Sequence, residues 1–139
     1  MAQPGVCCAS GSDLSARLGV AYWAIVFAVG FVFGIIRTLL VAPHIGATAA
    51  VLLEVPLIVI VSATVAARLL RGRVLSWRGR ATMGMLALAL TLASEAALAN
   101  VLNHQSFARW AASLVAVPGI IGLAGQLVFA TMPLMIVRR

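Results

Sequence analysis

The chain has 139 residues, of which 63% are hydrophobic and 9% charged, and its mean hydropathy is +1.13. An average soluble domain is about 25% charged, so this composition leaves too little polar surface for a globule in water and predicts a membrane protein. The net charge of +7 comes from arginines placed between apolar runs, so we expect no nucleic-acid partner.

Residues 1–15 are small and polar, and we expect them to form a disordered cytoplasmic tail. The tail carries Cys7 and Cys8, which are adjacent in sequence. Neighbouring cysteines rarely bond to each other, and two cysteines provide no disulfide framework. A tail thiol could accept a palmitoyl group or a metal ion, but an inert tail is our prediction, and we expect no metal site and no cofactor.

The first apolar run, about residues 18–42, is longer than the ~7–15 residues of a signal-peptide core and long enough to cross a bilayer. Tyr22 and Trp23 stand near its start, where we expect them at the membrane interface because amphipathic rings favour that position. The break at residues 43–46 is short and predicts a tight turn into a second span at about 47–67.

Residues 68–80 hold half of the ten arginines and connect to a third span at about 81–102. These side chains are expected to lie on anionic lipid headgroups, and each contact should contribute about 1 kcal/mol to membrane binding. Alternatively, the arginines serve only to keep this loop on the cytoplasmic side. The five are Arg68, Arg71, Arg73, Arg78 and Arg80.

The last apolar stretch, residues 107–137, is too long for one straight span. Pro118-Gly119 offers a break, so we place the fourth span at about 117–137. Phe107, Trp110 and Leu114 recur at helical spacing before that break, which predicts a short helix at the outer interface. One long kinked helix remains the alternative.

Eight arginines lie in the tail, in residues 68–80 and at the end of the chain, whereas only Arg109 lies in an opposite connection. Because Lys and Arg stay on the cytoplasmic side, both termini are predicted to be cytoplasmic. The predicted fold is therefore an all-α bundle of four transmembrane helices, N-in/C-in, that forms a single membrane domain over residues 16–139. This charge bias disfavours the dual topology of small multidrug exporters.

Three ionisable residues lie inside the predicted spans: Arg37, Glu54 and Glu95. Each would raise the free energy of inserting its helix into the membrane by about 2.5–3.5 kcal/mol if it were unpaired at the bilayer centre. At 1.5 Å per residue, all three lie about 8–12 Å below the same outer boundary. We therefore expect them to converge inside the bundle, together with Gln126.

Small residues share a helix face with these polar groups. Gly30 and Gly34 form a G-x-x-x-G step on the side of Arg37, and Gly119 and Gly122 precede Gln126. Small residues let helices approach closely in membranes, so these glycines are predicted to lie at helix contacts.

The polar cluster allows two interpretations: a proton or cation site reached from the outer face, or an ion-paired lock that fixes helix register. His44 and His104 lie in the two outer turns, where they could titrate with the cluster or be ordinary turn residues. We expect a proton- or cation-coupled transport subunit, alone as an oligomer or within a larger complex. The alternative is a non-catalytic accessory or assembly subunit. A membrane enzyme ranks third, because no catalytic motif is present.

Three motifs in the first half of the chain are Gly30-x-x-x-Gly34-x-x-Arg37, Pro43-x-x-Gly46 and Glu54-x-Pro56. This pattern resembles small four-helix bacterial inner-membrane proteins of unassigned function. The resemblance implies a bacterial inner membrane and a four-helix fold, and it brings no activity and no functional residues.

Overall fold

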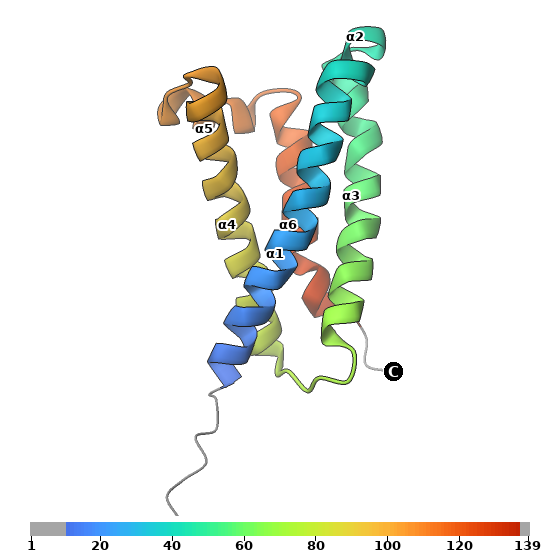
Figure 1. The fold of residues 1–139 in the computed structure, drawn as a ribbon, viewed down its shortest axis with the longest axis vertical. Helices are drawn as coiled ribbons and strands as arrows, with labels where there is room; N and C mark the ends of the chain where they lie inside the picture. The colour runs from blue at the N-terminus through green and yellow to red at the C-terminus, as the bar shows by residue number, and fades with distance from the viewer. Residues whose placement is uncertain (1–10, 137–139) are drawn as a thin grey trace, which may run out of the picture.

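The computed structural model describes residues 11–136, and every regular element in that range is a helix. Four long helices lie side by side (Figure 1): α1 (Gly11–Ile36), α3 (Ala47–Leu70), α4 (Trp77–Asn103) and α6 (Gly119–Met135). Three short elements connect them: the π-helix η1 (Arg37–Val41), α2 (Ala42–Ile45) and α5 (Phe107–Val115). Cys7 and Cys8 lie outside the described residues.

Three helical stretches are long and apolar enough to cross a membrane: Gly11–Ile45, Ala47–Leu70 and Trp77–Asn103. Helices α5 and α6 meet at 85° and together supply a fourth candidate. The all-helical class and the separate short helix before α6 are thus as predicted, and the alternative of one long kinked helix is wrong. Residues 11–15, predicted to belong to the tail, are instead the start of α1.

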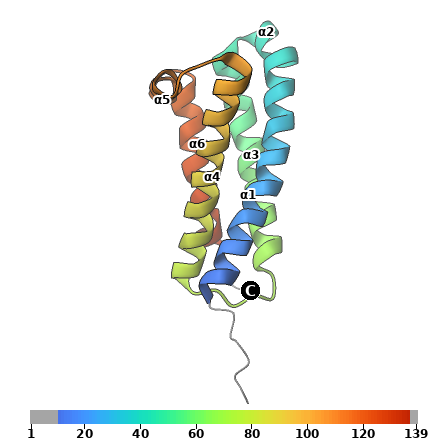
Figure 2. The same cartoon turned by 60° about the vertical axis from the view of Figure 1, so that its left-hand side comes forward.

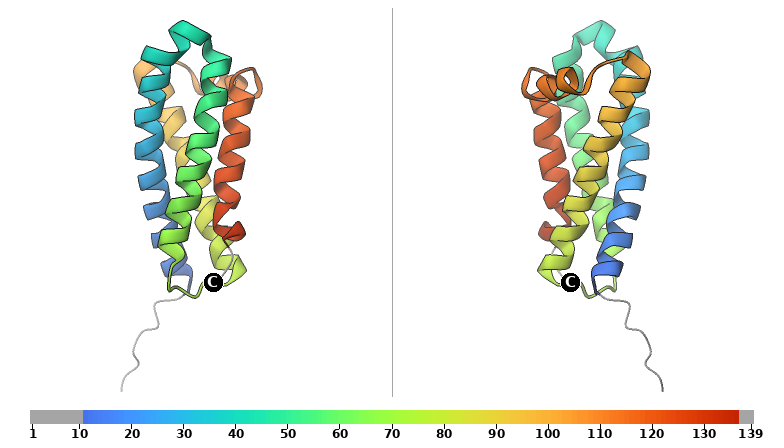
Figure 3. Two further views of the ribbon diagram at one scale, coloured as in Figure 1. Left: turned by 90° about the vertical axis from the view of Figure 1, so that its right-hand side faces the viewer. Right: turned by 90° about the vertical axis from the view of Figure 1, so that its left-hand side faces the viewer.

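The four long helices form a ring in the order α1, α4, α6, α3 (Figures 2 and 3). Helices α3 and α4, although consecutive in sequence, therefore face each other across the middle. We call the end where α1 begins and α6 finishes the arginine end, because it carries the loop between α3 and α4. We call the end with α2 and α5 the turn end.

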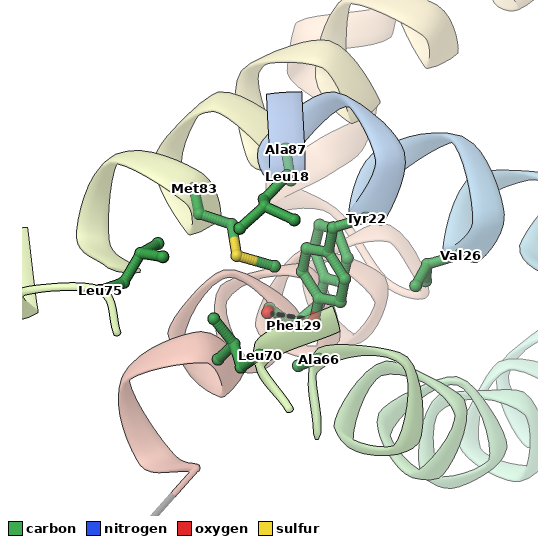
Figure 4. Packing of buried hydrophobic residues seen from close by; sticks show 9 residues of the cluster. All are labelled: Leu18, Tyr22, Val26, Ala66, Leu70, Leu75, Met83, Ala87 and Phe129. Atoms are coloured by element: carbon green, nitrogen blue, oxygen red, sulfur yellow. Dashed lines mark hydrogen bonds between the residues drawn. The ribbon is translucent and has the colours of Figure 1, made fainter. Parts of the chain in front are cut away.

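The apolar core lies toward the arginine end (Figure 4). The Tyr22 ring is fully buried and stacks on Phe129 of α6, with ring centroids 4.6 Å apart. Our prediction of an interfacial position for Tyr22 is therefore wrong: because α1 begins at Gly11, Tyr22 lies about three turns inside the helix. The core comprises Leu18, Tyr22, Val26, Ala66, Leu70, Leu75, Met83, Ala87 and Phe129.

A proline explains why the core contains a tyrosine. Pro133 lies inside α6 and has no N–H to donate to the carbonyl of Phe129, four residues earlier. The Tyr22 hydroxyl donates to that carbonyl oxygen at 2.9 Å. The side chain from α1 thus supplies the hydrogen bond that the proline removes from α6.

Arg80 is buried, with 9% of its surface exposed. Its Nη1 donates to the carbonyl oxygens of Ile136 at 2.6 Å and Pro133 at 3.4 Å. A cation at a helix C-terminus satisfies terminal carbonyls and the helix dipole. The prediction that Arg80 lies on lipid headgroups is therefore wrong, because its guanidinium caps α6.

Two glycines bring helices into backbone contact. A Cβ on Gly84 of α4 would collide with the carbonyl oxygen of Ala130 of α6, and one on Gly19 of α1 would lie 3.0 Å from the carbonyl oxygen of Met83. Both contacts lie in the half of the bundle that holds the core. Close approach of this kind is how small residues join helices in membranes.

The four glycines predicted to lie at helix contacts do not bring two long helices into backbone contact. A Cβ on Gly30 would meet only the Ile58 side chain, at 3.6 Å, and one on Gly119 would collide with the backbone of Ser113 across the bend before α6. Gly34 and Gly122 would meet nothing within 4 Å. The prediction of helix contacts is thus wrong for Gly34 and Gly122 within this chain, because both lie on open faces of the turn-end half.

Candidate functional site

The candidate site begins where α1 changes its hydrogen-bonding pattern. At Arg37 the α-helix becomes η1, in which the Ala42 N–H donates to the Arg37 carbonyl five residues back. Short π-helices are rare and are frequent at functional sites. Gly46, with φ of 84°, then reverses the chain into α3.

An ion pair joins η1 to α3. Arg37 Nε lies 3.1 Å from Glu54 Oε2, and the two side chains are 36% and 17% exposed. Both partners therefore lie at the edge of the bundle and not at its centre. Pro56 follows Glu54 inside α3 and leaves the Leu52 carbonyl without its usual helical donor.

A second polar pair joins α4 to α6. Gln126 Nε2 donates to Glu95 Oε1 at 2.5 Å. The other end of the amide, Gln126 Oε1, is buried and has no hydrogen-bond partner among the described residues. One residue earlier, a Cβ on Gly125 would lie 3.0 Å from the Val55 side chain, which shows that α6 approaches α3 beside the pair.

The two pairs lie within electrostatic reach of each other, since Arg37 and Glu54 both act on Glu95. We call Arg37, Glu54, Glu95 and Gln126 the polar cluster. One guanidinium and two carboxylates leave a net charge of −1 if all three ionise. Arg37 is in direct contact with Glu54, whereas the hydrogen-bonding partner of Glu95 among the described residues is the neutral amide of Gln126.

The two histidines, for which titration with the cluster and an ordinary turn role were both open, belong to different elements of the turn end: α2 and the end of α4. His44 is exposed in α2, and its Nδ1 lies 2.7 Å from the Leu40 carbonyl oxygen. His104 is exposed and caps α4 in the left-handed conformation, with φ of 49°. Within residues 11–136 no three His, Cys, Asp or Glu side chains are grouped to hold a metal ion.

The remaining predicted lipid contacts lie near the arginine end. Arg68 and Arg71 are exposed; Arg73 Nη1 donates to the Leu69 carbonyl, and Arg78 lies over the Trp77 ring, 5.8 Å from its centroid. At the turn end, exposed Arg109 belongs to α5, where Phe107 and Trp110 are in ring contact.

Two shallow hollows are found, both at the arginine end. One is lined by Leu75, Ser76, Trp77, Arg80 and Leu134, and the other lies between the start of α1 and the start of α4. The polar cluster lies in the other half of the bundle and consists of two direct side-chain pairs.

Sequence reasoning overlooked two polar contacts, those of Tyr22 and Arg80. A usable signal exists for the first: a proline inside an apolar span leaves the carbonyl four residues earlier without a donor. A second span then has to provide one, and Tyr22 is the only tyrosine in the chain. No comparable signal marks Arg80, which resembles its exposed neighbours in sequence.

Comparison with protein-family models, with curated proteins and with solved structures finds no match to this chain. The geometry of the polar cluster is therefore the basis on which a function is proposed.

Proposed function

We propose that this chain is a multi-pass protein of a bacterial cytoplasmic membrane, with α1, α3, α4 and the α5–α6 pair as four spans. The arginine end faces the cytoplasm in this proposal, and the turn end faces outward. The distribution of charge supports it: Arg17 and the exposed arginines between α3 and α4 gather at one end, and basic residues are retained on the cytoplasmic side. Anionic headgroups are the proposed partners of Arg68, Arg71, Arg73 and Arg78.

Within that membrane, the function best supported is a small proton- or cation-coupled transport subunit whose ion site is the polar cluster. One observation carries the proposal: Glu95 is held between α4 and α6 by an amide, while the nearest guanidinium is bound to Glu54. Intramembrane carboxyls are costly and mark ion and proton pathways. An exchangeable proton or cation would complete the charge that Arg37 does not neutralise.

The test is ion flux in proteoliposomes that contain the full chain, with a pH-sensitive dye inside and an imposed potassium diffusion potential. Glu54→Gln and Glu95→Gln should each reduce proton or sodium flux to background while the protein remains in the membrane. Asp13→Asn is the matched control, because Asp13 is the only other acidic residue and lies exposed in the first turn of α1. Equal flux in all three variants would refute the transport role.

A second candidate is a non-catalytic accessory subunit, and the open glycines favour it. A Cβ on Gly34 or Gly122 would meet nothing within 4 Å among the described residues, although small residues in membrane helices serve close helix contacts. A neighbouring copy or a larger complex would cover them. If purification in mild detergent yields a larger complex that Gly34→Leu disrupts, and flux is absent, the accessory role replaces transport and the cluster is a structural lock.

A further inference from the structure

Resting on the transport role proposed above, we infer that the exchanged ion is a proton, that Glu95 carries it, and that Glu54 is a fixed carboxylate. The two carboxyl groups are assigned different roles because they have different contacting partners. Glu54 has a guanidinium nitrogen at 3.1 Å, whereas Glu95 has an amide nitrogen at 2.5 Å. A contacting cation favours the charged form of an acid, while exclusion from water favours the neutral form.

The charged groups around Glu95 come from two elements. Arg37 of η1 and Glu54 of α3 both act electrostatically on Glu95. Arg37 is the contacting counter-ion of Glu54, and the described residues contain no ion pair to Glu95. Helix α6 contributes the neutral Gln126, and Arg109 of α5 is exposed. Glu95 is thus the carboxyl of the cluster without a committed counter-ion.

The ligands present fit a proton better than a metal cation. Metal cations such as Ca²⁺ require about six or more oxygen ligands. Gln126 turns its N–H toward Glu95, so the donor end of the amide occupies the place where a cation would need an oxygen. The nearby Thr91 and Ser94 hydroxyls donate to carbonyls of their own helix, those of Ala87 and Leu90.

The proposed step is a simple acid dissociation. The Glu95 O–H bond breaks, the proton passes to water on one side, and the electron pair stays on the carboxylate. The Gln126 N–H hydrogen bond stabilises that carboxylate until a proton from the other side restores the acid. Gln126 is therefore a positioning residue: it holds the carboxyl group and takes no proton itself.

The inference is tested by labelling the full chain in proteoliposomes with dicyclohexylcarbodiimide. This apolar reagent adds the carboxyl O–H of a protonated acid across its C=N bond and rearranges to a stable N-acylurea, which peptide mass spectrometry locates. We expect Glu95 to be labelled about tenfold or more above Glu54, in line with the effect of a contacting cation on an acid. Labelling should fall as pH rises, and Asp13, exposed to water, should remain unlabelled.

Two variants sharpen the assay. Arg37→Met removes the counter-ion of Glu54, so Glu54 should become labelled. Gln126→Leu should shift the pH profile of Glu95 labelling, whereas Gln105→Leu, in the exposed turn before α5, should not. A merely structural role for Gln126 would leave that profile unchanged and alter only the amount of folded protein.

The outcomes separate this inference from the transport role. Preferential labelling of Glu54, or protection of Glu95 by sodium at constant pH, would overturn the proton assignment even if Glu95→Gln abolishes flux. Selective labelling of Glu95 in a chain that moves no ion would overturn the transport role. Selective labelling together with proton flux that sodium does not alter supports both.

Discussion

The two halves of the bundle are built differently. Toward the arginine end, Tyr22 and Phe129 stack across the middle and Gly84 brings α4 against α6. Toward the turn end, α1 and α4 spread apart (Figure 1), and the last turns of α1 expose most of their apolar side chains. The exposed large residues at the end of α1 and in η1 include Phe31, Val32, Ile35, Ile36, Leu39 and Leu40.

The two halves therefore differ in role: one holds the packing contacts that stabilise the fold, and the other holds the ionisable groups. The backbone contacts at Gly19 and Gly84 and the buried Arg80 cap lie in one half, and the polar cluster lies in the other. Because packed interiors tolerate little change in volume, the half with the core should determine the free energy of unfolding. The half with the cluster can hold charges and change its protonation without dismantling the core.

The largest expected effect comes from Gly84→Val. Its Cβ would collide with the Ala130 carbonyl, so α4 and α6 must separate, at a cost of about 3 kcal/mol or more in the free energy of unfolding. Unfolding in detergent micelles measures this loss. Gly122→Val is the control, since it adds the same side chain where nothing lies within 4 Å. Equal losses in the two variants would contradict the proposed division of the bundle.

A smaller effect is expected from Tyr22→Phe. It leaves the Phe129 carbonyl without a donor, at a cost of about 1–3 kcal/mol. Pro133→Ala in the same chain restores an N–H four residues after Phe129 and should recover most of that loss. A double-mutant cycle of unfolding free energies measures this coupling. If Tyr22→Phe costs the same with and without Pro133→Ala, the hydroxyl does not replace the missing donor.

The smallest effects are expected from Gly34→Ala and Gly122→Ala. Alanine is favoured over glycine in a helix by about 1 kcal/mol, and both positions have space for a methyl group. Each variant of the isolated chain should therefore unfold at the same or a slightly higher temperature. A marked loss of stability would show that the turn-end half is packed as tightly as the core.

Hydropathy and charge predict a large part of this fold, because the length of each apolar run and the position of each charge within it can be read directly from the sequence. They locate the candidate spans, the bend at Pro118-Gly119 and the shared depth of Arg37, Glu54 and Glu95. The pairing of Arg37 with Glu54 follows from the same depth argument, since an unpaired charge in a span is costly.

Features that depend on helix rotation and contact are not predictable in this way. Gly84 and Gly122 look equivalent in sequence, yet only Gly84 meets a neighbouring backbone. Arg80 and Arg78 have similar surroundings in sequence, and only the folded structure shows that the end of α6 lies beside Arg80. The π-helix at Arg37 has no signal in the hydrophobic pattern of residues 18–42.

The bond from Tyr22 to Phe129 spans 107 positions of the chain and connects an early helix to a late one. During synthesis the Tyr22 hydroxyl has no such acceptor until α6 has been made, and Phe129 arrives with a carbonyl that α6 alone cannot satisfy. In a bilayer, where water offers no substitute, this mutual need favours packing of the last helix beside the other three over its release into lipid. The carbonyl left open by Pro133 thus gives α6 a polar reason to lie where the Tyr22 hydroxyl can reach it.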